Sequence, residues 1–195
     1  MRDFQHLEGL FRHASGDTAL SRLLPGEVLA DAMQGYFHHY GLEALLLDTS
    51  EVHAGFIDTG RFALWCQVWS PPQPVGTAFV VHGYFDHMGL YRHLLERLLA
   101  KGWRVVLWDL PGHGLSSGAR AAIEDFADYQ HCLAHLQMTL KSQGMAPEPW
   151  LGVGQSTGGA ILATGAAGAP GAALGMDPNQ LAALDCQPVF KRVAA

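Results

Sequence analysis

Apolar residues along this chain follow two periods in succession. Over residues 26–41 they recur at helical spacing, and Gly41 follows as a C-terminal cap. From residue 52 they alternate with polar residues, which predicts two antiparallel strands, 52–58 and 61–70, joined by a turn at Asp58. The apolar face predicted for the helix consists of Val28, Leu29, Met33, Tyr36 and Phe37.

After a proline-rich loop, short apolar runs alternate with amphipathic stretches. The runs lie at 77–81, 103–109 and 150–154, and the stretches with helical spacing at 89–102 and 122–144. Short apolar runs separated by helices are typical of a parallel sheet that is covered on both faces. The pattern predicts an α/β fold in which an antiparallel hairpin is followed by parallel strands with flanking helices.

Three segments differ in composition. Residues 1–48 are predicted to form a helical segment that packs across the rest, and residues 49–163 carry the α/β pattern. Residues 164–195 are rich in glycine and alanine, and each glycine weakens a helix by about 1 kcal/mol. We therefore expect a helix that begins at Thr157 to end near Gly165, with an atypical tail beyond it.

The composition has 49% hydrophobic residues and a formal net charge of -6. Lysine and arginine are not clustered, which argues against a nucleic-acid surface and favours small, neutral partners.

Cys66, Cys132 and Cys186 form no C-x-x-C pair, so we expect neither a disulfide framework nor a zinc site. The N-terminus does not resemble a signal peptide, and we expect a cytoplasmic protein with no transmembrane segment and no metal or organic cofactor.

The stretch Gly154-Gln155-Ser156-Thr157-Gly158 stands between a predicted strand and a predicted helix. A nucleophilic serine on such a sharp turn needs small residues two positions before and after it, and the helix that follows points its N-terminal N–H groups at developing negative charge. Two other interpretations are open. The stretch also fits a plain small-residue turn, and Gly152, Gly154 and Gly158 imitate a dinucleotide fingerprint, for which Asp177 lies near the expected acidic position.

Two further segments follow predicted strands. His82-Gly83-Tyr84 ends one strand, and the backbone N–H of Tyr84 could form an oxyanion hole together with the N–H of Thr157. The segment Asp109–Gly118, DLPGHGLSSG, ends the next strand and is rich in turn-forming residues. Each of these segments alone predicts no more than a loop.

In order and spacing, the three segments together resemble the α/β-hydrolase superfamily, in the branch of monoacylglycerol lipases, lysophospholipases and serine-aminopeptidase-like hydrolases. Strands of that branch end in HGxxEH, in D-x-x-G-H-G-x-S and in G-H/Q-S-x-G-G, and the likeness covers about residues 50–163. It implies that Ser156 is the nucleophile and that Tyr84 and Thr157 supply the oxyanion N–H groups. Asp86 stands where the branch generally has Glu. The matching motif positions are His82, Gly83, Asp86, His87, Asp109, Gly112, His113, Gly114, Gly154 and Gly158.

The catalytic base departs from this pattern. A serine needs a base to take its proton, and in this family an acid and then a histidine follow the serine. All 11 histidines precede Ser156, and Asp177 and Asp185 are the only acids after it. We expect the chain to be the N-terminal part of an incomplete α/β-hydrolase fold, cut short or frameshifted soon after Ala163, with an unpaired sheet edge that favours self-association.

The resemblance implies a serine hydrolase of carboxylic esters, monoacylglycerol or lysophospholipid-like, that works through an acyl-enzyme at Ser156. As this polypeptide we expect it to be inactive, because the triad acid and histidine are missing from it. The alternative is a non-catalytic hydrolase-fold remnant or binding module. Labelling of Ser156 by a fluorophosphonate discriminates between the two.

Overall fold

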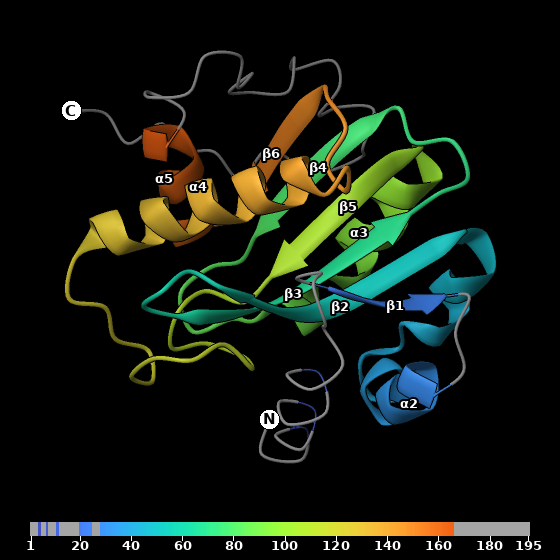
Figure 1. The fold of residues 1–195 in the computed structure, drawn as a ribbon, viewed down its shortest axis with the longest axis horizontal. Helices are drawn as coiled ribbons and strands as arrows, with labels where there is room; N and C mark the ends of the chain where they lie inside the picture. The colour runs from blue at the N-terminus through green and yellow to red at the C-terminus, as the bar shows by residue number, and fades with distance from the viewer. Residues whose placement is uncertain (1–3, 5–6, 8–10, 12–19, 25–27, 166–195) are drawn as a thin grey trace.

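A six-stranded mixed sheet runs through the molecule in the order β1-β2-β3-β5-β4-β6 (Figure 1). The computed structural model describes residues 4, 7, 11, 20–24 and 28–165. The strands are β1 Ser21–Leu24, β2 Glu51–Asp58, β3 Ala63–Ser70, β4 Gly76–Val81, β5 Trp103–Trp108 and β6 Trp150–Gly154. The predicted hairpin and the three predicted parallel strands are confirmed.

The type of strand pairing changes once across the sheet, from antiparallel to parallel. β1, β2, β3 and β5 pair antiparallel in that order, whereas β4 pairs parallel with β5 on one side and with β6 on the other. Because β5 and β6 lie on opposite sides of β4, the connections that leave β4 and β6 diverge at the carboxyl edge of the sheet. Open α/β sheets bind ligands at such a reversal of strand order.

Helices cover both faces of the sheet, with α4 and α5 on one face and α2 and α3 on the other (Figure 1). The helices are α2 Val28–Tyr40, α3 Arg92–Ala100, α4 Phe126–Ser142 and α5 Thr157–Gly165, and the two 3₁₀ turns are η2 Glu43–Asp48 and η3 Met88–Tyr91. None of the helices in the described part of the chain combines the length and the apolar character that a membrane span requires.

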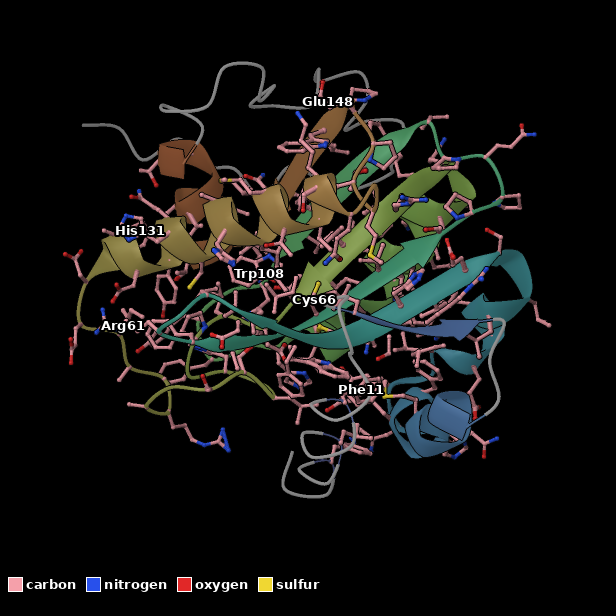
Figure 2. All side chains as sticks on the ribbon, in the orientation of Figure 1. Phe11, Arg61, Cys66, Trp108, His131 and Glu148 are labelled. Carbon is pink, nitrogen blue, oxygen red and sulfur yellow. The ribbon has the colours of Figure 1, made fainter. Side chains whose placement is uncertain are left out.

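The two faces of β3 belong to two different hydrophobic cores. Trp65 and Trp69 pack with α2 and α3, while Cys66 packs with α4 and α5 and pairs with Trp108 of β5 (Figure 2). All eight residues of β3 are buried, because helices lie on both sides of it. In the turn before β3, Arg61 extends to α4 and binds the carboxylate of Asp128 at 2.7 Å (Figure 2).

The N-terminal segment differs from the helical segment expected over residues 1–48. Ser21–Leu24 forms β1, which pairs antiparallel with β2, and Leu23 is buried in the core. Four residues carry too short a pattern to predict a strand, and pairing with β2 and burial of Leu23 stabilise them. The predicted helix is confirmed as α2. Its side chains at Val28 and Leu29 lie outside the described residues, as does the tail 166–195 with Asp177, Asp185 and Cys186.

The predicted helix cap is present. Gly41 has a φ of +65°, and Leu42 N donates to the carbonyl of Phe37 at 2.8 Å, which closes the last turn of α2. Met33 and Tyr36 of this helix are buried in the same core as the tryptophans of β3. The helix is therefore part of the main hydrophobic core on that face of the sheet.

Candidate active site

Ser156 lies at the junction of β6 and α5, on an abrupt turn. Its φ is +51°, a left-handed conformation that is strained for any residue with a side chain. Ser156 is exposed, and its carbonyl accepts the first helical hydrogen bond of α5 from Ala160 N at 3.1 Å. The turn therefore places this serine at the surface beside the N-terminus of α5.

Gly154 and Gly158 flank Ser156 and pack against each other. A Cβ atom on Gly154 would lie 2.5 Å from the carbonyl carbon of Gly158, and a Cβ atom on Gly158 would lie 2.1 Å from the carbonyl oxygen of Val81. Both distances are far shorter than van der Waals contact, and the neighbouring atoms are backbone that cannot move aside. The turn therefore needs glycine at both positions.

The end of β4 lies directly beside this turn. Val81 pairs with Gly154 in the parallel ladder, and the carbonyl of Val81 accepts a hydrogen bond from Gln155 N at 3.2 Å. The loop that leaves β4 begins with His82 and Gly83, and the carbonyl oxygen of Gln155 lies 3.5 Å from the position of a Cβ atom on Gly83. The loops after β4 and β6 are thus in contact immediately before Ser156.

Two backbone N–H groups of these loops, those of Tyr84 and Thr157, have no hydrogen-bond acceptor in the described part of the chain. Thr157 begins α5, so its N–H lies at the partially positive end of that helix. The side chain of Tyr84 packs against the loop after β5, where its hydroxyl donates to the carbonyl of Ala121 and its ring lies 5.3 Å from that of His113. Neither backbone N–H group is therefore used in a hydrogen bond within the described residues.

His82 is buried and hydrogen-bonded at both ring nitrogens. Nδ1 bonds the carbonyl of Gly83 at 2.7 Å, and Nε2 bonds Leu110 N at 2.9 Å. Because a backbone N–H donates to Nε2, the proton of the neutral ring lies on Nδ1. Burial lowers the pKa of His82 to about 4, so the ring is neutral near pH 7. His82 joins the loops after β4 and β5, and neither nitrogen is free to accept a proton from Ser156.

Tyr91, at the end of η3, brings three groups together. Its hydroxyl accepts a hydrogen bond from Gly83 N at 3.1 Å, and it lies 3.2 Å from Oδ2 of Asp86 and 2.5 Å from Oε1 of Gln155. Burial raises the pKa of Tyr91 to about 12.

His87 has a different role, because its Nδ1 accepts from Gly89 N at 3.2 Å and caps η3. Its pKa is lowered by burial.

Asp109 is buried at the end of β5 and orders the loop that follows. Its Oδ1 accepts from Met88 N at 2.7 Å, and its Oδ2 accepts from Leu115 N at 2.9 Å. Burial raises the pKa of this carboxyl group, and the two N–H donors oppose the rise. Gly114 passes so close to Asp109 that a Cβ atom there would lie 1.8 Å from Oδ2. Asp109 therefore binds backbone N–H groups of two segments, the one after β4 and the one after β5.

Gly112 and His113 shape the same loop. Gly112 has a φ of +74°, and a Cβ atom there would lie 2.1 Å from the carbonyl oxygen of Ala119. His113 is buried, and its Nδ1 bonds the carbonyl of Pro111 at 2.9 Å, while its Nε2 has no partner among the described residues. These residues thus build the surface on which the Tyr84 side chain rests.

Other chemistries find little support in the described residues. No group of three His, Cys, Asp or Glu side chains in that part of the chain could hold a metal ion. Cys66 and Cys132 are buried, and burial raises the pKa of Cys132 to about 11, so this thiol stays protonated. The dinucleotide interpretation needs Asp177, which lies outside the described residues.

The sequence did not identify Tyr91 as a site residue. Its partners Gly83 and Gln155 are eight and 64 positions away along the chain, so no local motif connects them. The motif residues that the sequence did identify lie in the loops at the carboxyl ends of β4, β5 and β6, at the last residue of β6 or at the start of α5.

Comparison with known proteins adds the family. Residues 72–176 match the family described as "Serine aminopeptidase, S33". Monoglyceride lipase of Homo sapiens is 35% identical over 137 residues, which are 68% of this chain and 45% of that protein. Monoacylglycerol lipase of Mycolicibacterium smegmatis is 28% identical over 127 residues, which are 65% of this chain and 45% of that protein. The chain spans about half the length of the curated relatives it matches.

Solved structures show the same fold. A structure titled "Lipase (Open form)" superposes with a TM-score of 0.54 at 26% identity and covers 63% of this chain and 42% of its own. An α/β-hydrolase from Penicillium sp. sh18 has a TM-score of 0.55 at 18% identity, covering 60% of this chain and 42% of its own, and shows the fold alone. With the strand order and the serine turn described above, these matches lead to one conclusion: the chain belongs to the serine aminopeptidase S33 family of α/β-hydrolases.

Proposed function

We propose that this chain carries the nucleophile and the oxyanion hole of a serine hydrolase that acts on carboxylic esters, of the monoacylglycerol or lysophospholipid kind. Ser156 Oγ attacks the ester carbonyl and loses its proton to a base, the alcohol leaves with a proton, and water then hydrolyses the acyl-enzyme. The N–H groups of Tyr84 and Thr157 stabilise the negative charge on the carbonyl oxygen in both steps.

The observation that carries the proposal is the strained, exposed Ser156 turn held against the loop of a second strand. A positive φ at a residue with a side chain costs of order 1–2 kcal/mol, and such strain persists mainly at functional sites. A plain small-residue turn needs neither this strain nor two unpaired N–H groups on adjacent loops. The relatives named as monoglyceride and monoacylglycerol lipases support the choice of substrate class.

The base is the second part of the proposal. All 11 histidines precede Ser156, and both nitrogens of His82 are already hydrogen-bonded. The Nδ1 of His113 is bonded to Pro111, and its Nε2 is buried. We therefore propose that this polypeptide by itself turns over esters poorly, because neither His82 nor His113, the buried imidazoles that follow β4 and β5, has an exposed free nitrogen to accept the serine proton.

Reaction with a fluorophosphonate tests the nucleophile directly. The serine oxygen displaces fluoride from phosphorus, so the adduct forms without hydrolysis of an ester. We expect slow labelling of the native protein at Ser156, with solvent taking the serine proton, found by mass spectrometry of the modified peptide, and its loss in Ser156→Ala. Ser142→Ala is the matched control, because Ser142 is exposed at the end of α4 and only bonds the carbonyl of Thr139.

Added imidazole tests the missing base. If the proton acceptor is lacking, millimolar imidazole should raise the labelling rate of the native chain but not that of Ser156→Ala. Absence of labelling in the folded protein, with and without imidazole, would favour the non-catalytic remnant or binding module. Rapid monoacylglycerol hydrolysis by this chain alone would instead show that a base is present.

A further inference from the structure

We propose that Tyr91 is a positioning residue that couples the two loops of the oxyanion hole. Through one hydroxyl it connects Gly83, which precedes Tyr84, with Gln155, which precedes Ser156. This inference rests on the proposed function, because it assigns a role within the same site. It concerns the alignment of the two N–H groups rather than a proton transfer.

The hydroxyl of Tyr91 has one proton and two lone pairs for its three neighbours. It accepts from Gly83 N at 3.1 Å, and it donates its single proton either to Oε1 of Gln155 at 2.5 Å or to Oδ2 of Asp86 at 3.2 Å. The raised pKa of Tyr91, about 12, keeps this proton in place over the whole neutral range. The loops after β4 and β6 are therefore connected by a group that is both donor and acceptor.

The peptide between Gly83 and Tyr84 is held through its carbonyl, whereas Tyr91 binds the N–H of the preceding peptide. The carbonyl of Gly83 accepts from His82 Nδ1 at 2.7 Å and from Asp86 N at 3.2 Å. A trans peptide is planar, so the direction of this carbonyl sets the opposite direction of the Tyr84 N–H. Tyr91 holds the N–H of Gly83 while these two donors hold its carbonyl, and together they fix where the Tyr84 N–H points.

The second loop is aligned through Gln155. Its backbone N–H bonds the carbonyl of Val81 at 3.2 Å, and its own carbonyl accepts from Gly158 N at 2.9 Å. Its side chain is the part that reaches Tyr91, although the residue is otherwise exposed. An exposed glutamine held by the half-buried hydroxyl of Tyr91 connects the Ser156 turn to the β4 loop. An oxyanion hole needs such a connection, because a misplacement of 1 Å costs about a hundredfold in rate.

Tyr91→Phe removes the hydroxyl and keeps the ring. We expect the maximal rate of fluorophosphonate labelling to fall roughly tenfold to a hundredfold, with little change in the reagent concentration at half-saturation. The phosphoryl oxygen uses the N–H pair in the transition state, whereas the initial binding of the reagent does not. Hydrogen exchange at the Gly83 amide should also become faster, and this readout needs no reaction at Ser156.

Tyr129→Phe is the matched control. The Tyr129 hydroxyl is buried and has no partner in the described part of the chain, so its removal makes the same chemical change without breaking a link. Gln155→Ala and the double variant Tyr91→Phe/Gln155→Ala complete a double-mutant cycle, which measures how far the effects of the two substitutions depend on each other. If the two residues act through one contact, the double variant should label no more slowly than the slower single variant.

The outcomes separate this inference from the proposed function. If the native chain is not labelled at all, the proposed function fails, and Gly83 exchange alone then decides whether Tyr91 holds the loop. If the native chain is labelled and Tyr91→Phe matches Tyr129→Phe in both rate and exchange, the coupling is overturned. If Tyr91→Phe melts at a much lower temperature, Gln155→Ala replaces it, because it removes only an exposed side chain.

Discussion

Three residues other than glycine have a positive φ in the described part of the chain, and all three border the candidate site. They are Phe85 at +65°, Ala121 at +46° and Ser156 at +51°. Phe85 follows Tyr84, and Ala121 accepts the hydrogen bond of the Tyr84 hydroxyl. Backbone strain of this kind costs about 1–3 kcal/mol per residue and persists only where the surroundings impose it. The strain is thus concentrated where the loops after β4, β5 and β6 meet.

At the same scale, His82 should make stability depend on pH. Its pKa is about 4 in the folded protein and near the ordinary 6.5 when unfolded, so the unfolded chain binds more protons between these values. The free energy of unfolding should be highest above pH 6.5 and fall by roughly 3 kcal/mol as the pH drops to about 4. Urea titrations of the native protein and of His82→Gln across this range measure the effect.

The informative quantity is the difference between the free energies of unfolding of the native protein and of His82→Gln at each pH. The pKa of Asp109 is raised by burial, so this carboxyl group acts on stability in the opposite direction as the pH falls. His82→Gln cannot titrate at this position, and its curve should lack the loss that His82 causes. An equally steep loss in His82→Gln would show that another group is responsible.

At the scale of elements, the junction between β6 and α5 depends on the absence of side chains. Gly158 packs on the carbonyl oxygens of Val81 and His82, at 2.1 and 2.7 Å from the position of a Cβ atom. The helix can begin immediately after the strand only because α5 approaches β4 this closely. The contact of Gly158 with the end of β4 thus fixes the position of α5 directly after β6 and the serine turn.

We expect Gly158→Ala to lower the free energy of unfolding by at least about 2 kcal/mol, since backbone atoms must move to admit the methyl group. Gly35→Ala is the control within α2, where the nearest atom to a Cβ is 3.8 Å away. That substitution should raise stability by about 0.5–1 kcal/mol through helix propensity. Chemical denaturation of both variants checks the pair, and a Gly158→Ala variant as stable as the native protein would contradict the packing described for the turn.

At the scale of the whole molecule, the two edges of the sheet differ. β1 forms one edge, is four residues long and carries the exposed Arg22. β6 forms the other edge, has no charged residue and pairs only with β4 among the described residues. Short strands and charges protect an edge from pairing with another chain, and β6 lacks the charge.

We therefore expect self-association through β6. Sedimentation velocity over a dilution series should show a mass that rises with concentration, and hydrogen exchange within Trp150–Gly154 should slow as it does so. Exchange within β1 serves as the internal control and should not change. A constant monomer mass, or added protection at β1 instead of β6, would contradict this prediction.

Much of the fold could be predicted because its signals are local. The hairpin and the three parallel strands follow from the spacing of apolar residues, and the serine turn follows from small residues between a strand and a helix. The period of apolar residues is visible within a single segment, so these elements can be predicted from the sequence before their long-range contacts are known. The three motif segments were accordingly expected at the ends of strands, and the structure has them there.

Only the tertiary structure decided the contacts between distant segments. β1 pairs with β2, and the hydroxyl of Tyr91 reaches Gln155 because β6 pairs with β4. The hydrogen bond between His82 and Leu110 likewise requires the parallel pairing of β4 with β5. A single side-chain hydrogen bond leaves no periodic pattern in a sequence, and its partner is chosen by which strands become neighbours when the whole sheet forms.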